Sequence, residues 1–233
     1  MISQGENMIR STQKWWGIVA LALICFAPCA FANSSLTMTG AGNDVMDGVY
    51  VGPYYATVNG VKNTPVICDD FADESYIGHS WNFTANNFST LGSSLWGNQT
   101  SNYEAAAWLT LQMLSLNSNP GNATQVGYLS YAIWSLFDKG ALGGLNSTQL
   151  AGVNTWLGKI PLNLTPGQFA NFLFLTPQGC TNGPGSCPGQ EFMQVMPEGG
   201  SAAMYLLLAG IACLGALLLR RRRQASAPSS SAA

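Results

Sequence analysis

An uninterrupted apolar run near the C-terminus constrains this chain of 233 residues more than any other feature. The run extends over residues 202–219, contains no charged residue, and is followed directly by four arginines at 220–223. A helix of this length, rising about 1.5 Å per residue, can just cross a bilayer. Because arginines are costly to translocate, the four would stay in the cytoplasm. The run therefore predicts a transmembrane helix over 202–219 and a cytoplasmic tail over 224–233. The protein would cross the cell membrane once, with its main domain extracytoplasmic.

A short motif, Met196-Pro197-Glu198-Gly199-Gly200-Ser201, precedes the apolar run. The motif, the apolar run and the arginine cluster together resemble the PEP-CTERM sorting signal, which an exosortase recognises, although Gly199 stands where that signal usually has its second proline. The Gly-Gly pair also resembles the GlyGly-CTERM signal, which a rhomboid-type protease processes. Either resemblance implies a bacterial protein with a sorting signal over 197–223, which a sorting protease cuts at 197–201, and that is afterwards at the cell surface or secreted. The residues implied in sorting are Pro197, Glu198, Gly199, Gly200, Arg220, Arg221, Arg222 and Arg223.

The N-terminus has the three parts of a secretory signal peptide. Arg10 and Lys14 supply positive charge, residues 15–26 form an apolar stretch, and Ala30-Phe31-Ala32 provides a cleavage site with small residues at both ends. We expect cleavage after Ala32, so that residues 1–32 are removed. The remaining segment, 33–196, has a length that suits one extracytoplasmic domain.

The charge of this domain excludes one class of partner. Between residues 33 and 197, three lysines stand against nine acidic side chains, which gives a net charge of −6. A field of this sign repels nucleic acid, so we expect no nucleic-acid partner. Charged residues make up only 9% of the chain. The abundance of Asn, Ser, Thr and Gly suits contact with sugars and suggests exopolysaccharide as a partner.

Three cysteines remain in the predicted domain. Cys180 and Cys187 flank a loop rich in Gly and Pro, and in an exported protein this spacing predicts a disulfide. Cys68 is then the odd cysteine, and it is a candidate reactive thiol. A buried thiol and an intermolecular bridge are the other interpretations.

Hydrophobic patterning predicts a single α+β domain, with N-terminal and C-terminal strands around a helical middle. Asn59-Gly60 is a strong hairpin signal between two of the strands. Ser101 and Glu104 have the spacing of a capping box for the first helix. The predicted strands are 49–51, 54–58, 65–71, 81–88, 172–175 and 190–195, and the predicted helices are 103–114, 124–138 and 147–157.

Two segments carry a second resemblance. Val66-Ile67-Cys68-Asp69-Asp70-Phe71 and Ser130-Tyr131-Ala132-Ile133-Trp134 are similar to paired segments of bacterial thioester domains. In that family a cysteine bonds to the glutamine of a Gln-x-Ala-Ile-Trp segment, and the resulting acyl–sulfur bond captures an amine. Ser130 stands where this glutamine is expected, and Gln125 lies five residues earlier. The resemblance therefore implies a related fold without the covalent bond.

One acidic cluster could carry chemistry, and its members are Asp69, Asp70, Asp73 and Glu74. Paired carboxylates can serve as acid and base in glycoside cleavage, and they can also bind calcium. In a strand, however, the side chains of Asp69 and Asp70 would point to opposite faces. We therefore expect a solvated acidic turn, with no metal and no cofactor.

Three functional hypotheses remain. The leading one is a non-enzymatic, exported bacterial surface protein that is anchored by its C-terminal helix, processed by a sorting protease, and associated with exopolysaccharide or a biofilm matrix. The first alternative is an adhesin similar to thioester domains, which uses Cys68. The second alternative is a carbohydrate-active enzyme that uses the acidic cluster, although the sequence contains no recognisable catalytic motif.

Overall fold

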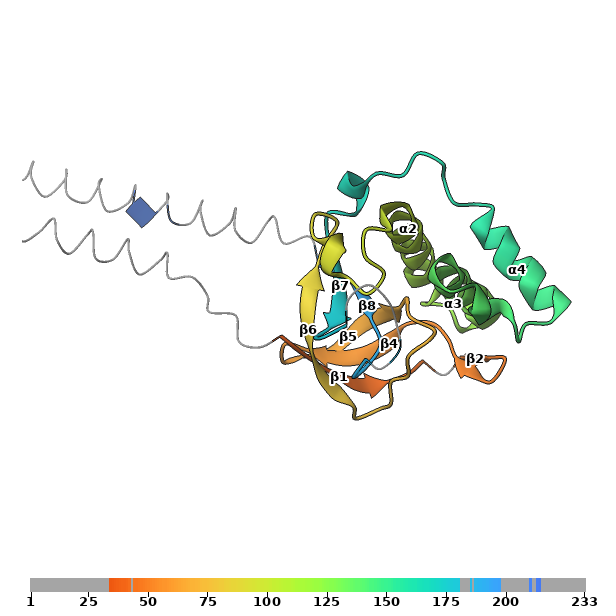
Figure 1. The fold of residues 1–233 in the computed structure, drawn as a ribbon, viewed down its shortest axis with the longest axis horizontal. Helices are drawn as coiled ribbons and strands as arrows, with labels where there is room; N and C mark the ends of the chain where they lie inside the picture. The colour runs from red at the N-terminus through yellow and green to blue at the C-terminus, as the bar shows by residue number, and fades with distance from the viewer. Residues whose placement is uncertain are drawn as a thin grey trace, which may run out of the picture. The chain divides into compact units, whose positions relative to one another are not determined.

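The structure, a computed structural model, describes residues 34–42, 44–180, 185, 187–197, 210, 213 and 214. Its central feature is a closed, antiparallel β-barrel with the strand order β1-β4-β5-β8-β7-β6 (Figure 1). Closure pairs each of these six strands on both edges. The strands are β1 (Ser35–Gly40), β4 (Tyr54–Val58), β5 (Val61–Cys68), β6 (Ser80–Asn86), β7 (Phe172–Pro177) and β8 (Phe192–Val195).

The hairpin of β4 and β5 forms as its turn residues predict. Asn59 and Gly60 have φ angles of 50° and 82°. Two successive positive φ angles belong to the tight turn whose twist matches that of the flanking strands. Gly60 adopts such an angle without steric cost, and Asn tolerates it better than most residues.

Three helices cover one side of the barrel (Figure 1). α3 contacts both α2, which precedes it in the chain, and α4, which follows it. A capping box starts α4, because the Asn146 side chain accepts from the backbone N–H of Gln149, and the Gln149 side chain accepts from that of Asn146. The helices are α2 (Thr100–Leu116), α3 (Ala123–Phe137) and α4 (Ser147–Leu157).

Two hydrophobic cores share the β5–β8–β7 part of the sheet. Alternate side chains of a strand point to opposite faces, so Cys68 and Phe192 lie inside the barrel while Ile67 and Met193 face the helices. The helix-side core adds buried residues of α2 and α3, such as Leu109 and Ile133. The core inside the barrel consists of Leu36, Met38, Ala56, Val58, Val66, Cys68, Trp81, Phe83, Leu175 and Phe192.

A second, two-stranded sheet packs against α3. It consists of β2 (Val45–Met46) and β3 (Val49–Tyr50). The side chain of Met46 lies so close to Gly127 of α3 that a Cβ atom there would overlap it. The absence of a side chain at Gly127 therefore lets this hairpin dock closely.

The predicted fold class is wrong, because it lacks the closed barrel and includes a transmembrane helix that the described residues do not contain. The strands near the two ends of the domain close into one barrel, and the prediction named no barrel and missed β1. The capping box at Ser101 and Glu104 is also absent, because α2 begins after Gln99 and has no side-chain cap. Each predicted strand and each of the three predicted helices corresponds to an element of the structure within a few residues.

The predicted transmembrane helix and the single-pass membrane localisation are contradicted. Within the part of the chain that the structure describes, no helix combines the length and the hydrophobicity needed to span a bilayer. Of the predicted span 202–219, only Gly210, Cys213 and Leu214 are among the described residues. The predicted signal peptide, 1–32, and the arginine cluster at 220–223 lie outside them.

A buried leucine and an exposed leucine together provide a test of the helix-side core. Leu109 is fully buried and Leu162 is 99% exposed. We expect Leu109→Ala to lower the free energy of unfolding by about 2–5 kcal/mol, because it removes buried apolar surface and leaves a cavity. The same substitution at Leu162 should change it by less than about 0.5 kcal/mol. Urea unfolding of the two variants measures this difference, and equal losses would contradict the assignment of Leu109 to the core.

Candidate functional site

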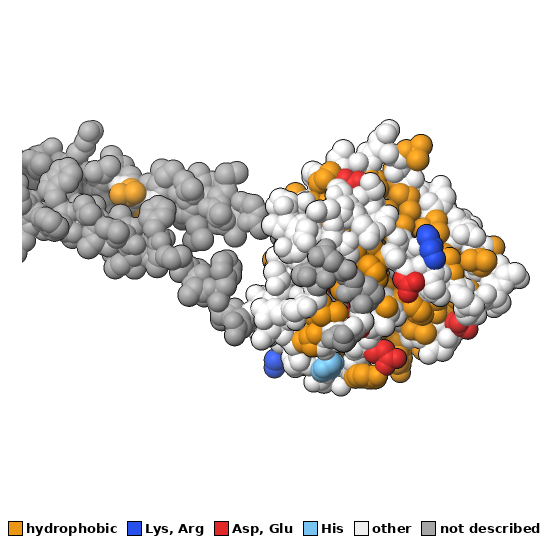
Figure 2. Space-filling model, in the orientation of Figure 1, with side chains coloured by type: hydrophobic (Ala, Val, Ile, Leu, Met, Phe, Trp, Pro, Cys, Tyr) orange, Lys and Arg blue, Asp and Glu red, His pale blue; other side chains and the backbone are white. Residues whose placement is uncertain are grey.

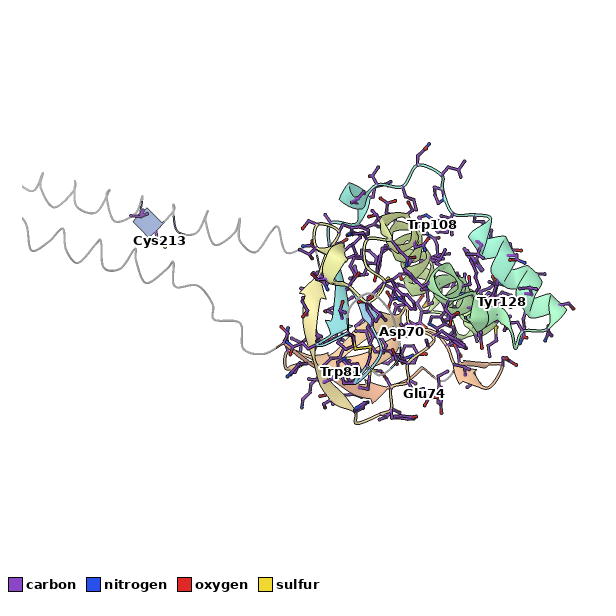
Figure 3. All side chains as sticks on the ribbon, in the orientation of Figure 1. Asp70, Glu74, Trp81, Trp108, Tyr128 and Cys213 are labelled. Atoms are coloured by element: carbon purple, nitrogen blue, oxygen red, sulfur yellow. A yellow bond between two sulfur atoms is a disulfide. The ribbon has the colours of Figure 1, made fainter. Side chains whose placement is uncertain are left out.

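The predicted site residues lie at the end of β5, where this strand pairs with β8. The register sets Ile67 opposite Met193 and Cys68 opposite Phe192. Continued by two residues, the same antiparallel register sets Asp69 opposite Glu191 and Asp70 opposite Gln190. This register brings residues 68–70 and 190–192 together in the domain. Figure 3 labels Asp70 at this position.

Cys68 is a buried thiol on the barrel side of this strand end. It is 2% exposed, and its Sγ donates to the carbonyl oxygen of Asp70 at 3.0 Å. Burial raises the pKa of the thiol well above its ordinary value, and the neighbouring carboxyls of Asp70 and Asp69 raise it further. The thiol is therefore neutral at physiological pH, which lowers its nucleophilicity.

The two segments that resemble thioester domains are in contact. The indole Nε1 of Trp134 donates to the carbonyl oxygen of Cys68 at 3.0 Å. Ser130, one turn earlier on α3, accepts from the backbone N–H of Gly52 at 2.9 Å and donates to the carbonyl oxygen of Val126 at 3.2 Å. The serine that stands at the glutamine position thus serves to join α3 to the loop before β4.

Asp69 and Glu191 form a buried carboxyl pair, and both are fully buried. Glu191 accepts hydrogen bonds from the backbone N–H of Leu95 at 2.9 Å, from the hydroxyl of Tyr103 at 2.6 Å, and from the hydroxyl of Thr176. Among the described residues, neither carboxyl oxygen of Asp69 has a hydrogen-bond partner of normal geometry.

One proton removes one of the two negative charges that this pair would otherwise bury. Burial raises the pKa of both carboxyls, and the charge of Glu191 raises that of Asp69 further. The three donors around Glu191 oppose the rise of its own pKa. Asp69 is therefore the member that holds the proton, and Glu191 accepts the surrounding hydrogen bonds.

Asp70 closes a turn immediately after β5. Its Oδ1 accepts from the backbone N–H groups of Ala72 at 3.0 Å and Asp73 at 3.3 Å. Burial, with a smaller contribution from the charge of Asp73, raises the pKa of this carboxyl to about 7. The two hydrogen bonds to Oδ1 act in the opposite direction and lower the pKa. Its backbone oxygen accepts from the thiol of Cys68 and from Nε2 of Gln190, which lies 2.7 Å away.

The structure separates the four members of the predicted acidic cluster. Asp69 and Asp70 are buried, whereas Glu74 is exposed and accepts from the hydroxyl of Tyr76. Asp73 lies beside the loop of Cys180, and its Oδ2 accepts from the backbone N–H of Gly185 at 3.2 Å. The described residues include no group of three or more His, Cys, Asp or Glu side chains that could hold a metal ion. The prediction of a solvated turn is wrong for Asp69 and Asp70.

Cys180 and Cys187 form the predicted disulfide. Their Cα atoms are 5.7 Å apart, and the two sulfurs are bonded across a separation of seven residues. Of the remaining cysteines in the described part of the chain, Cys68 is buried and Cys213 is exposed.

Sequence reasoning missed four polar residues of this site. Glu191 and Gln190 lie in a segment that was predicted only as a strand. Tyr103 was read only as the first residue of a helix, and Thr176 lies just after the predicted strand 172–175. One signal was available. Glu191 is the only acidic side chain of the 190–195 strand segment, so its burial would require partners from elsewhere in the fold.

Comparisons with known proteins give one distant structural similarity. No family model matches the chain, and no curated protein matches it. A solved structure that it is similar to is the N-terminal thioester domain of fibronectin-binding protein SfbI from Streptococcus pyogenes. The identity is 10%, the TM-score is 0.40, and the similarity covers 73% of this chain and 97% of that chain.

The buried carboxyls predict a stability that falls as pH rises. The pKa of Asp70 in the folded protein is raised to about 7. The contribution of this shift to the free energy of unfolding is therefore fully present below the ordinary pKa of an aspartate. It is lost as the pH rises through about 7, where the buried carboxyl must ionise. The raised pKa values of Asp69 and Glu191 act in the same direction. We expect a loss of about 2 kcal/mol between about pH 5 and pH 8, measured by urea unfolding.

Asp70→Asn is the matched variant, because an amide keeps the acceptor for Ala72 and Asp73 and removes the titration. The pH dependence of unfolding should be smaller in this variant by the share that Asp70 contributes. A wild-type stability that rises from pH 5 to pH 8 would show that these carboxyls are ionised in the folded protein.

Proposed function

We propose that this chain is an exported, non-enzymatic bacterial protein that associates with an exopolysaccharide or biofilm matrix. The observation that carries the proposal is the disulfide between Cys180 and Cys187. Disulfides persist in oxidising environments outside the cytoplasm and are rare inside it. The bridge agrees with the signal peptide predicted over 1–32, which directs a chain to such an environment.

The surface supports contact with uncharged partners. Figure 2 shows a face made mostly of backbone, uncharged polar side chains and scattered hydrophobic side chains, with few basic and few acidic side chains. Such a surface offers hydrogen bonds to hydroxyl-rich polymers without the long-range attraction that nucleic acid or anionic lipid would require. Processing at 197–200 by a sorting protease of the exosortase or rhomboid type belongs to the same proposal.

The positions of the acidic residues favour a non-enzymatic role over glycoside cleavage. A glycosidase needs two carboxyl groups that flank the bond to be cut in a site open to the substrate. Asp69 and Asp70 are fully buried, and the exposed Glu74 is engaged with Tyr76. These positions do not suit glycoside cleavage by the acidic cluster.

Cell fractionation of the native host tests the proposal. We expect the mature protein to begin near Asn33, to be recovered with the extracellular polysaccharide, and to give a peptide in which Cys180 and Cys187 remain linked without reductant. Dithiothreitol-treated protein is the control for the linked peptide. Recovery of the protein in the cytosol with both cysteines reduced would overturn the proposal.

One observation favours a second candidate, an adhesin that uses a thioester at Cys68. The thiol of Cys68 and the side-chain amide of Gln190 both donate to the backbone oxygen of Asp70, at 3.0 Å and 2.7 Å. The separation of the two groups therefore cannot exceed the sum of those distances. Gln190 could take the place of the glutamine that is missing at Ser130.

The bond would form by attack of the Cys68 sulfur on the side-chain carbonyl carbon of Gln190. An acyl–sulfur bond replaces the carbon–nitrogen bond, and the amide nitrogen leaves as ammonia together with the thiol proton. An amine of another molecule could then displace the sulfur and become covalently attached to Gln190.

Intact-mass measurement of the native protein decides this second candidate. A thioester predicts a mass lower by one ammonia than the sequence requires, after allowance for the disulfide, and restoration of that mass when ammonia is added. Cys68→Ala and Gln190→Glu should each abolish the deficit. A full mass, together with a thiol at Cys68 that iodoacetamide alkylates after unfolding, would exclude the thioester.

A further inference from the structure

A polar cavity lies where the β2–β3 hairpin meets the helices. Its volume is about 430 Å³, which is within the range of pockets that hold small ligands. The hairpin contributes Asp44 and Asp47, and the start of α3 contributes Thr124 and Tyr128. Gln149 of α4 completes the polar lining. None of the residues that line it is a lysine or an arginine.

Close packing against glycines holds two of these side chains in place. The ring of Tyr128 lies against Gly152 of α4, where a Cβ atom would overlap it. Figure 3 labels Tyr128 beside this helix. The carboxylate of Asp47 lies against Gly144 in the same way. The aromatic ring and one carboxylate are therefore positioned by the fold.

We propose that this cavity binds a short segment of a neutral polysaccharide. This inference rests on the proposed association with an exopolysaccharide and names the site that would carry it. The hydroxyl groups of a sugar donate to carboxylates, and such charge-assisted hydrogen bonds are about twice as strong as neutral ones. Asp44 and Asp47 provide these acceptors, while Thr124 and Gln149 can both donate and accept.

The aromatic ring provides the remaining element of recognition. A pyranose ring has an apolar face of C–H groups, and the negative face of a tyrosine ring attracts such groups. Tyr128 is half-buried, so part of its surface remains open to solvent. The two carboxylates, with no basic residue in the lining, disfavour uronic acids and sulfated sugars.

Another cavity of similar size fits a glycan less well. Its volume is about 390 Å³, and it lies between Phe88 and Phe169. No charged side chain lines it, and its exposed lining is mostly apolar. It therefore lacks the strong acceptors that the cavity at Asp44 and Asp47 offers to sugar hydroxyls.

Titration calorimetry on the full protein recovered from its host tests the site. The probes are cellohexaose and N-acetylchitohexaose as neutral oligosaccharides, and an alginate oligomer of the same length as the anionic one. We expect at least one neutral probe to bind more tightly than alginate. Tyr128→Ala should weaken that binding by about tenfold, since it removes the aromatic surface. Asp44→Asn, which keeps the side-chain shape, should weaken it several-fold.

Matched controls come from an exposed pair outside the cavity. Tyr76→Ala and Glu74→Gln make the same chemical changes in side chains that contact each other at the surface. Their affinities should stay within about twofold of the wild type. Circular dichroism of each variant shows whether it is folded, and Asp44→Asn keeps the test decisive if Tyr128→Ala unfolds the protein.

Co-sedimentation with the exopolysaccharide of the host separates this inference from the proposed function. If the wild type binds that polymer and Tyr128→Ala and Asp44→Asn bind it equally well, the site is wrong and the proposed function stands. If the wild type binds the polymer but neither neutral probe, or binds alginate best, the ligand class is wrong. If the wild type does not bind the polymer at all, the proposed function itself is overturned.

Discussion

The pairing of β5 with β8 is the contact on which the rest of this structure depends. It joins an early strand to the last described one and completes the order β1-β4-β5-β8-β7-β6. The same two-residue alternation sends Cys68 and Phe192 into the barrel and Ile67 and Met193 towards the helices. A register shift of one residue would turn over the strand that slips, so that either Asp69 or Glu191 would face the inside of the barrel and the carboxyl pair would be lost. The two cores and the buried carboxyl pair are therefore consequences of one register.

The buried carboxyls connect the barrel to the helical side. Glu191, immediately before β8, accepts from Tyr103 on α2, from Leu95 in the loop before that helix, and from Thr176 on β7. Removing a carboxylate from water is costly, and the donors offset that cost only while they stay in position. Asp69 avoids the cost by holding a proton. The arrangement thus requires the correct placement of four separate segments, which makes it a constraint on the packing of α2 against the sheet.

Much of the local structure could be predicted because its causes are local. Asn59-Gly60 determines a tight turn by its own φ angles, and Asn146 with Gln149 caps α4 within a single turn. Apart from the capping box at Ser101 and Glu104, which is local and is absent, the main failures concern pairings over long distances in the chain. Nothing in the sequence near Cys68 indicates that Phe192 lies opposite, so both the barrel and the partnership of Asp69 with Glu191 were missed. The disulfide was predictable because only seven residues separate its cysteines.

Barrel closure also explains how a chain with so few charges can expose so many strands. Sheet edges invite pairing with other molecules, and many proteins protect them with lysines or other charged side chains. This chain has charged residues at only 9% of its positions. In the part of the chain that the structure describes, the six barrel strands leave no free edge, and the short β2–β3 hairpin is docked on α3 through Met46 and Gly127. A surface with few charged side chains is thus compatible with a sheet protein, because hydrogen bonding within the barrel provides the protection that charge provides elsewhere.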